Sequence, residues 1–182
     1  MFTGLGLHVV NPDVQVIGSP SDVAFALIHA CSLRGTNMNA DVSTIAQTIL
    51  GIERSANERW NKGDCSGYLE IYSEDITYFD PVTEKLLVGR KAAEAHILKL
   101  YSNPHIVRSE YRNPEVAVSD DGHIAVLSYN LWNFIADDAG GEKLLTNWNC
   151  TEVYRLSDGK WRITHSHWSF VQHPAIMQNA TV

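Results

Sequence analysis

The chain has 182 residues, 45% of them hydrophobic and 19% charged, and its formal net charge is −7. This composition predicts a folded domain rather than a disordered chain, and the acidic balance argues against nucleic acid and anionic membrane surfaces as partners. The three cysteines, Cys31, Cys65 and Cys150, form no Cys-x-x-Cys motif, so we predict neither a disulfide framework nor a zinc ribbon. No run of about 18 apolar residues occurs, and we expect a cytoplasmic protein.

Residues 1–37 differ in composition from the rest of the chain, because they contain no lysine and a single arginine. We expect this segment to be an accessory extension, with an edge strand over residues 14–17 and a short helix over residues 21–32. One domain is then predicted over residues 38–173, and a tail over residues 174–182.

From Asp41 onward apolar residues recur at helical spacing, which predicts an amphipathic helix with one face made by Ile45, Ile49, Ile52, Ala56 and Trp60. Gly63 predicts the end of this helix, since glycine accepts the left-handed conformation found at helix C-termini. Asp64 is expected to cap a second, short helix. A strand over residues 76–80 should stop at Pro81, and a third helix is predicted from Gly89 to about residue 101.

The remainder of the chain is rich in β-forming residues and is divided by turn sequences containing Asp-Gly or Gly-Gly. Helices that precede an antiparallel meander indicate an α+β fold rather than alternating α/β units. Long bent strands around the helices should form a cone with an interior cavity. The predicted strands cover residues 107–119, 123–136, 142–156 and 161–171.

Four segments in order, residues 61–64, 72–82, 88–89 and 158–169, resemble the nuclear transport factor 2-like superfamily, in particular its SnoaL-like and DUF4440 groups. Residues 75–82 are similar to ketosteroid isomerase. The closing strand is similar to the association domain of calcium/calmodulin-dependent kinase II. The resemblance covers about residues 41–170. It implies a cone in which three N-terminal helices pack into a strongly curved antiparallel sheet.

The similarity to ketosteroid isomerase implies roles for two carboxyl groups. Asp80 falls on the general base, and Glu152 falls on a carboxylic acid that donates a hydrogen bond to the oxyanion. If Glu152 points inward, strand alternation places other side chains in the cavity. The predicted substrate-binding residues are Trp60, Tyr78, His96, Asn130, Trp132, Trp148, Tyr154, Ser166 and Trp168.

These residues favour a cofactor-independent enzyme of isomerase, dehydratase (lyase) or cyclase type, acting on a small apolar carbonyl compound. Asp80 would abstract a proton next to the carbonyl. Burial among tryptophans would raise the pKa of Glu152, so that the neutral acid could donate to the enolate, as in ketosteroid isomerase. The oxyanion tyrosine of that enzyme aligns with Ala56, so this donor is missing here.

An alternative function is a noncatalytic ligand-binding or homo-oligomeric association module. A homodimer or larger assembly through the outer sheet face, which carries His165 and His167, is expected in either case. The His-x-His pattern invites a metal site, but no acidic residue comes after it, and alternation turns both rings away from the cavity. We therefore predict no metal. Asp80 could instead only cap the turn at Pro81, and Glu152 could lie on an exposed face.

Overall fold

The structure, a computed structural model, describes residues 7–10, 33–101 and 105–171, and the strand and helix predicted over residues 14–17 and 21–32 lie outside them. Three helices are described: α1 (Leu33–Asn61), α2 (Ser66–Leu69) and α3 (Arg90–Leu100). The described strands are β1 (Leu7–Val10), β2 (Tyr72–Phe79), β3 (Leu87–Val88), β4 (Arg108–Ser119), β5 (Ile124–Ala136), β6 (Glu142–Ser157) and β7 (Lys160–Phe170).

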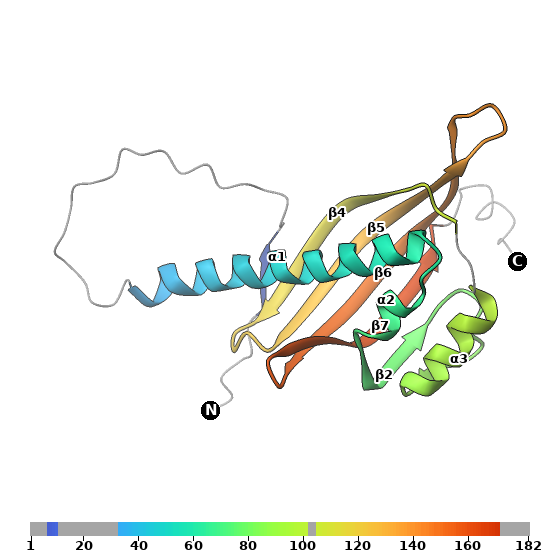
Figure 1. The fold of residues 1–182 in the computed structure, drawn as a ribbon. Coiled ribbons are helices and arrows are strands. Elements are labelled where there is room, and N and C mark those ends of the chain that lie inside the picture. The colour runs from blue at the N-terminus through green and yellow to red at the C-terminus, as the bar shows by residue number, and fades with distance from the viewer. Residues whose placement is uncertain (1–6, 11–32, 102–104, 172–182) are drawn as a thin grey trace, which may run out of the picture.

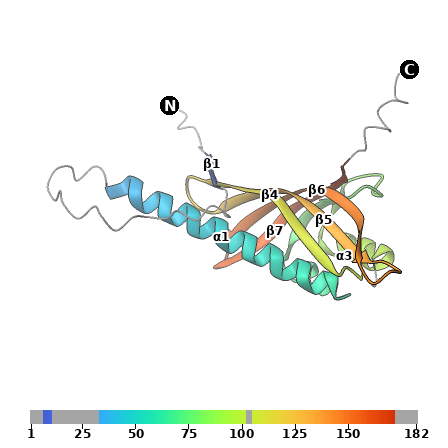
Figure 2. The same cartoon turned by 90° about the horizontal axis from the view of Figure 1, so that it is seen from above.

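Within the described residues, the strands form one seven-stranded sheet in the order β1-β4-β5-β6-β7-β2-β3. Neighbouring strands are antiparallel, except that β2 runs parallel to β7. Helix α1 lies along one face of the sheet, α2 packs against α1, and α3 lies beside β2 (Figures 1 and 2). The arrangement confirms the predicted α+β fold, and the parallel pairing of β2 with β7 makes the sheet mixed rather than wholly antiparallel as predicted.

Irregular pairing bends the long strands. Register shifts occur between Arg112 and Glu115 in β4, and between Val153 and Tyr154 where β6 meets β7. Asn113 in the first of these has a φ of 50°, the left-handed region that asparagine tolerates better than most residues. The bends give the sheet the curvature that makes room for a cavity.

The segment predicted to be an accessory extension contributes to this sheet. Strand β1 pairs with β4, from Leu7 opposite Ser119 to Val10 opposite Val116. Helix α1 also begins within this segment, at Leu33. The predicted boundary at residue 37 therefore falls inside a helix, and its functional meaning stays a prediction.

The core lies between α1 and the inner face of the sheet. Ala46, Ile49 and Ala56 of α1 are buried there, and Ile163 of β7 is fully buried among them. Burying a large aliphatic side chain contributes about 1.5–3 kcal/mol. Packing thus fixes α1 on the sheet. None of the described helices is both long and apolar enough to cross a membrane.

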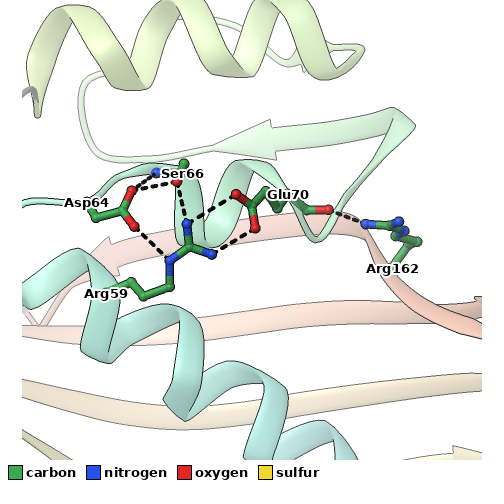
Figure 3. Close-up of polar contacts among 5 residues, drawn as sticks. All are labelled: Arg59, Asp64, Ser66, Glu70 and Arg162. Atoms are coloured by element: carbon green, nitrogen blue, oxygen red, sulfur yellow. Dashed lines mark hydrogen bonds and ion pairs between the residues drawn. The ribbon is translucent and has the colours of Figure 1, made fainter.

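The junction between α1 and α2 is held by a cluster of charged groups (Figure 3). The Arg59 guanidinium donates to the carboxylates of Asp64 and Glu70 at 2.7 and 2.8 Å, and also to the Ser66 hydroxyl. Arg162 of β7 donates to the backbone carbonyl of Glu70. Individual exposed ion pairs contribute little, but this network joins α1, α2 and β7 at one point.

Substituting alanine at two glycines should have effects of opposite sign. A Cβ at Gly67 in α2 would lie 2.8 Å from the Ala56 carbonyl oxygen and 3.0 Å from the Arg59 Cβ. Gly67→Ala is therefore expected to cost about 1–3 kcal/mol of unfolding free energy, because the backbone cannot yield cheaply. Gly51→Ala meets nothing within 4 Å in α1 and should stabilise by about 0.5–1 kcal/mol.

Urea denaturation of the two variants beside the wild type measures both effects. Equal stability of the Gly67→Ala and Gly51→Ala variants would contradict the close packing of α2 on α1.

Candidate functional site

A cavity of about 70 Å³ lies between the helices and the inner face of the sheet, large enough for a few water molecules or a small organic group. Its walls are mainly aromatic, with two amides and one carboxylate. The lining residues are Asn57, Trp60, Tyr68, Tyr72, Tyr78, Asp80, Tyr101, Leu131, Asn133, Trp148 and Trp168.

Asp80 is the carboxylate of this cavity and is only 6% exposed. Its Oδ1 accepts from the Val82 backbone N–H at 3.0 Å, so Asp80 does cap the turn after β2. Its Oδ2 contacts the His96 Nε2 at 2.7 Å. The hydroxyls of Tyr78 and Tyr101 donate to the same oxygen, each at 3.3 Å. The capping role and the cavity role therefore coexist in one side chain.

The charge on Asp80 affects its tyrosine neighbour. Burial, and then the negative charge of Asp80, raise the pKa of Tyr101 to about 12. The Tyr101 phenol therefore stays protonated at neutral pH and can go on donating to the carboxylate. His96 approaches from α3 and is not among the residues lining the cavity, so its ring supports the carboxylate from behind.

Glu53 of α1 is a second carboxyl group, which was not predicted from the sequence. It is fully buried, and its Oε1 accepts from the hydroxyls of Tyr68 at 2.7 Å and Tyr129 at 2.6 Å. Its Oε2 accepts from the hydroxyl of Tyr154 at 2.6 Å. Burial raises the pKa of Glu53, and the three phenol donors oppose that rise. Tyr68 connects this carboxyl to the cavity wall.

Glu152 of β6 is fully buried but is not among the residues lining the cavity. Its Oε1 accepts from the Ser166 hydroxyl at 3.0 Å, and Ser166 in turn accepts from the indole N–H of Trp168 at 2.9 Å. No hydrogen-bond partner for its Oε2 is found among the described residues. Burial, and then the nearby charge of Glu53, raise the pKa of Glu152 well above its usual value, as predicted from the sequence.

This raised pKa makes stability depend on pH. The folded protein holds a proton that the unfolded chain releases above its usual pKa of 4.5, so the stabilisation is complete below that pH and is lost as pH rises towards the folded-state pKa. Glu152→Gln carries no such proton. We expect the variant to gain stability relative to the wild type by up to about 1.4 kcal/mol for each pH unit above pH 4.5.

Denaturant titrations between pH 4 and pH 8 measure this difference, with the exposed Glu115→Gln in β4 as the matched control. A difference between Glu152→Gln and the wild type that stays constant across that range would contradict a neutral Glu152.

Strand alternation placed the β6 side chains correctly. Trp148, Cys150, Glu152 and Tyr154 all turn toward the interior, and Trp148 lines the cavity. Of the other predicted residues, Trp60, Tyr78 and Trp168 also line the cavity, while His96 contacts Asp80. Tyr154 and Ser166 are buried beneath the wall as partners of the two glutamates.

The prediction for β5 is wrong by one residue. Leu131 and Asn133 line the cavity, so Asn130 and Trp132 lie on the outer face. Directly paired residues of antiparallel strands share a face, and Leu131 lies opposite the inward-facing Trp148. On the outer face, the Arg112 guanidinium lies 3.5 Å from the ring centre of Trp132.

The cavity also uses residues that were not assigned to it from the sequence: Asn57, Tyr68, Tyr72, Tyr101, Leu131 and Asn133. The sequence does indicate that Glu53 is buried, because this residue comes one helical turn after Ile49 on the apolar face of α1. A carboxyl group in that position requires buried hydrogen-bond donors. Tyr101, just after the end of α3, carried no such pattern.

His165 and His167 lie on the outer face of β7. Thr77 Oγ1 lies 2.8 Å from the His165 Nδ1, and the two imidazole centres are 6.4 Å apart. Burial, and then His167, lower the pKa of His165. No cluster of three or more potential metal ligands occurs in the described part of the chain. The role of this face in joining copies of the chain stays a prediction.

Known proteins share sequence features and fold with this chain. A family model described as the SnoaL-like domain matches residues 52–173. The chain belongs to the SnoaL-like domain family. The matched region of this SnoaL-like domain begins within α1 and contains Asp80, His96, Glu53 and Glu152. It therefore holds the whole cavity, and β1 lies before it.

Solved structures share the fold of this SnoaL-like domain. A ketosteroid isomerase-like protein from Parabacteroides distasonis is 31% identical, with a TM-score of 0.61 over 72% of this chain and 90% of its own. The association domain of CaMKII from C. elegans is 20% identical, with a TM-score of 0.61 over 72% of this chain and 99% of its own. A nuclear transport factor 2-like protein of unknown function from Pseudomonas putida is 21% identical, with a TM-score of 0.59 over 74% and 92% of the two chains.

Proposed function

We propose that this SnoaL-like domain is a cofactor-independent enzyme of isomerase, dehydratase or cyclase type. Its substrate would be a small carbonyl compound with an apolar body, and Asp80 would accept the proton. The observation that carries the proposal is the position of Asp80. A nearly buried carboxylate lies in the wall of an aromatic cavity, and its Oδ2 is contacted by His96, Tyr78 and Tyr101.

The surroundings of Asp80 suit a general base. The Val82 N–H fixes one carboxylate oxygen, and His96 and two tyrosines hold the other toward the cavity. A fixed orientation brings the base to one C–H bond of a bound substrate. The proton would move from the carbon next to the carbonyl to Asp80, and then to another atom of the substrate. Proton transfer of this kind contributes about 10²–10⁴-fold to a rate.

The carbonyl oxygen of the substrate would be bound by a residue other than Glu152. Ser166 and Trp168 stand between Glu152 and the cavity, so its part is to position that wall. Asn133 lines the cavity and uses its Oδ1 to accept from Ser109 at 2.8 Å, which leaves its N–H group to donate to a ligand. We assign Asn133 as the donor to the developing enolate oxygen.

Exchange of α-protons in small ketones tests this function without knowledge of the natural substrate. In D2O the wild type should catalyse deuterium incorporation into at least one neutral or cationic ketone, and Asp80→Asn should lose that catalysis. The matched control is Asp75→Asn, which changes an exposed carboxylate of β2 that pairs with Arg155. A wild type no faster than buffer with every ketone would overturn the proposal.

A further inference from the structure

The cavity wall is built as an aromatic box. Trp60 meets Tyr68 at 77° and Tyr101 at 53°, with ring centres 5.9 and 5.6 Å apart. Trp168 meets Tyr68 at 88° and Trp148 at 88°, with ring centres 6.1 and 6.0 Å apart. Because these rings are steeply inclined to one another, their faces point in several directions around the cavity. Each ring face carries partial negative charge, which attracts cations.

Three tyrosine hydroxyls of the wall present acceptors to the cavity. Tyr68 donates its hydroxyl proton to Glu53, and Tyr78 and Tyr101 donate theirs to Asp80. A hydroxyl whose proton is committed in this way offers a ligand only its oxygen lone pairs. The cavity therefore presents acceptors from these three tyrosines.

The charged groups of the cavity favour the same kind of ligand as these hydroxyl oxygens do. Asp80 lines the cavity, and none of the described residues that line it is lysine or arginine. Glu53 lies behind Tyr68 in a fully buried position. A carboxylate charge acts more strongly in a partly buried site than at the surface, because the effective dielectric constant is lower there. An anionic ligand would meet repulsion here, and a positive ligand would be attracted.

Ordinary core packing does not account for this wall. Trp60, Trp148 and Trp168 are only partly buried and face an open cavity rather than filling it. A plain hydrophobic core also has no need of a carboxylate, which is costly to bury without a charge partner. His96 contacts Asp80 at 2.7 Å but lies outside the lining, whereas Asp80 itself is one of the residues that line the cavity.

We propose that the cavity binds a small organic cation of the alkylammonium class, held between the tryptophan and tyrosine faces with its charge near Asp80. This inference rests on the proposed function, because it names the substrate class of the same site: a small carbonyl compound that carries an ammonium group. When Asp80 takes a proton, its negative charge moves to the enolate oxygen. A substrate cation would remain beside that charge in a cavity that supplies no lysine or arginine from its described lining.

A pair of probes with the same shape isolates the charge. Choline and 3,3-dimethylbutan-1-ol differ in a quaternary nitrogen replaced by carbon. Calorimetric titration of the full chain should give a dissociation constant for choline lower than that of the alcohol by at least about tenfold. Equal or tighter binding of the alcohol, or no binding of either probe at millimolar concentrations, would overturn the inference.

Two variants locate the bound cation. Asp80→Asn removes the carboxylate charge and should reduce the preference for choline to less than about threefold. Asp75→Asn should retain the full preference, since its carboxylate is exposed and pairs with Arg155. Thermal unfolding shows whether each variant is folded. A preference that survives in a folded Asp80→Asn, or that disappears in Asp75→Asn, would place the cation elsewhere and contradict the assignment.

The two claims about this site fail in different ways. Preferential choline binding without α-proton exchange in any ketone would sustain the cation site and overturn the proposed chemistry. Exchange in neutral ketones without preference for choline would sustain the chemistry and overturn the cation site.

Discussion

Glu53→Gln is expected to lower the free energy of unfolding by about 3 kcal/mol. Three tyrosine hydroxyls converge on the Glu53 carboxylate at 2.6 to 2.7 Å, in a position with no exposure to solvent. A glutamine keeps one acceptor oxygen and replaces the other with an N–H donor, which then faces a hydroxyl donor. At least one buried polar group loses its partner, and such a loss costs about 1–3 kcal/mol before the weakening of the remaining bonds is counted.

Urea denaturation at pH 7 measures this loss, with Glu58→Gln as the matched control. Glu58 lies on the same helix but is exposed, so the same change there should alter stability by no more than about 0.5 kcal/mol. Equal stability of the two variants would show that the three hydroxyls do not depend on a carboxylate.

The same chemical change at the two buried glutamates should have opposite signs. Glu53 receives three donors, whereas Glu152 receives one from Ser166 and leaves its second oxygen without a described partner. Replacement of the carboxyl group therefore destabilises the first site, and at the second it removes the cost of holding a proton at neutral pH. Burial alone does not decide the effect of removing a carboxylate, because the number of donors around it determines which form is stable.

Most of the fold could be predicted from the sequence because its signals are local. Predicted strands over residues 123–136 and 161–171 correspond to Ile124–Ala136 and Lys160–Phe170. Turn sequences delimit these strands, and helical spacing identifies the buried face of α1. Gly63 has a φ of 89°, as its predicted place at the end of the helix requires.

The direction in which a side chain points depends on partners that the sequence does not reveal. For β5 the prediction took the wrong parity, which reversed Asn130 and Trp132. In β7 the register shift opposite Val153 and Tyr154 breaks the alternation, so that Ile163 and Ser166 are both buried. A single irregular residue thus undoes a prediction that is sound for a regular strand.

The site was predicted in part for the same reason. Asp80 could be placed through its turn before Pro81, but its contact with His96 joins the turn after β2 to α3, which only tertiary packing brings together. Glu152 was correctly turned inward, yet Ser166 and Trp168 separate it from the cavity. The alternation of side chains along a strand predicts the face of the sheet on which a group lies. It does not predict how deeply that group is buried behind the cavity wall.

Asp80→Asn should have the largest effect on activity, a loss of about two to four orders of magnitude in catalysed proton exchange. Asparagine can still accept from the Val82 N–H and preserve the turn, so the fold should survive. Its amide cannot take a proton from carbon at neutral pH. The substitution therefore separates the capping role of Asp80 from its role as a base, which removal of the whole side chain would not do.

The most direct measurement is the rate of α-deuteration, monitored by proton NMR in D2O at neutral pH. The ketones are cyclohexanone, 4,4-dimethylpentan-2-one and its cationic counterpart acetonyltrimethylammonium, each compared with its rate in buffer alone. We expect wild type and Asp75→Asn to exchange at least one of them at rates within about twofold of each other. Asp80→Asn should fall toward the buffer rate. A folded Asp80→Asn that exchanges as fast as the wild type would contradict Asp80 as the proton acceptor of this cavity.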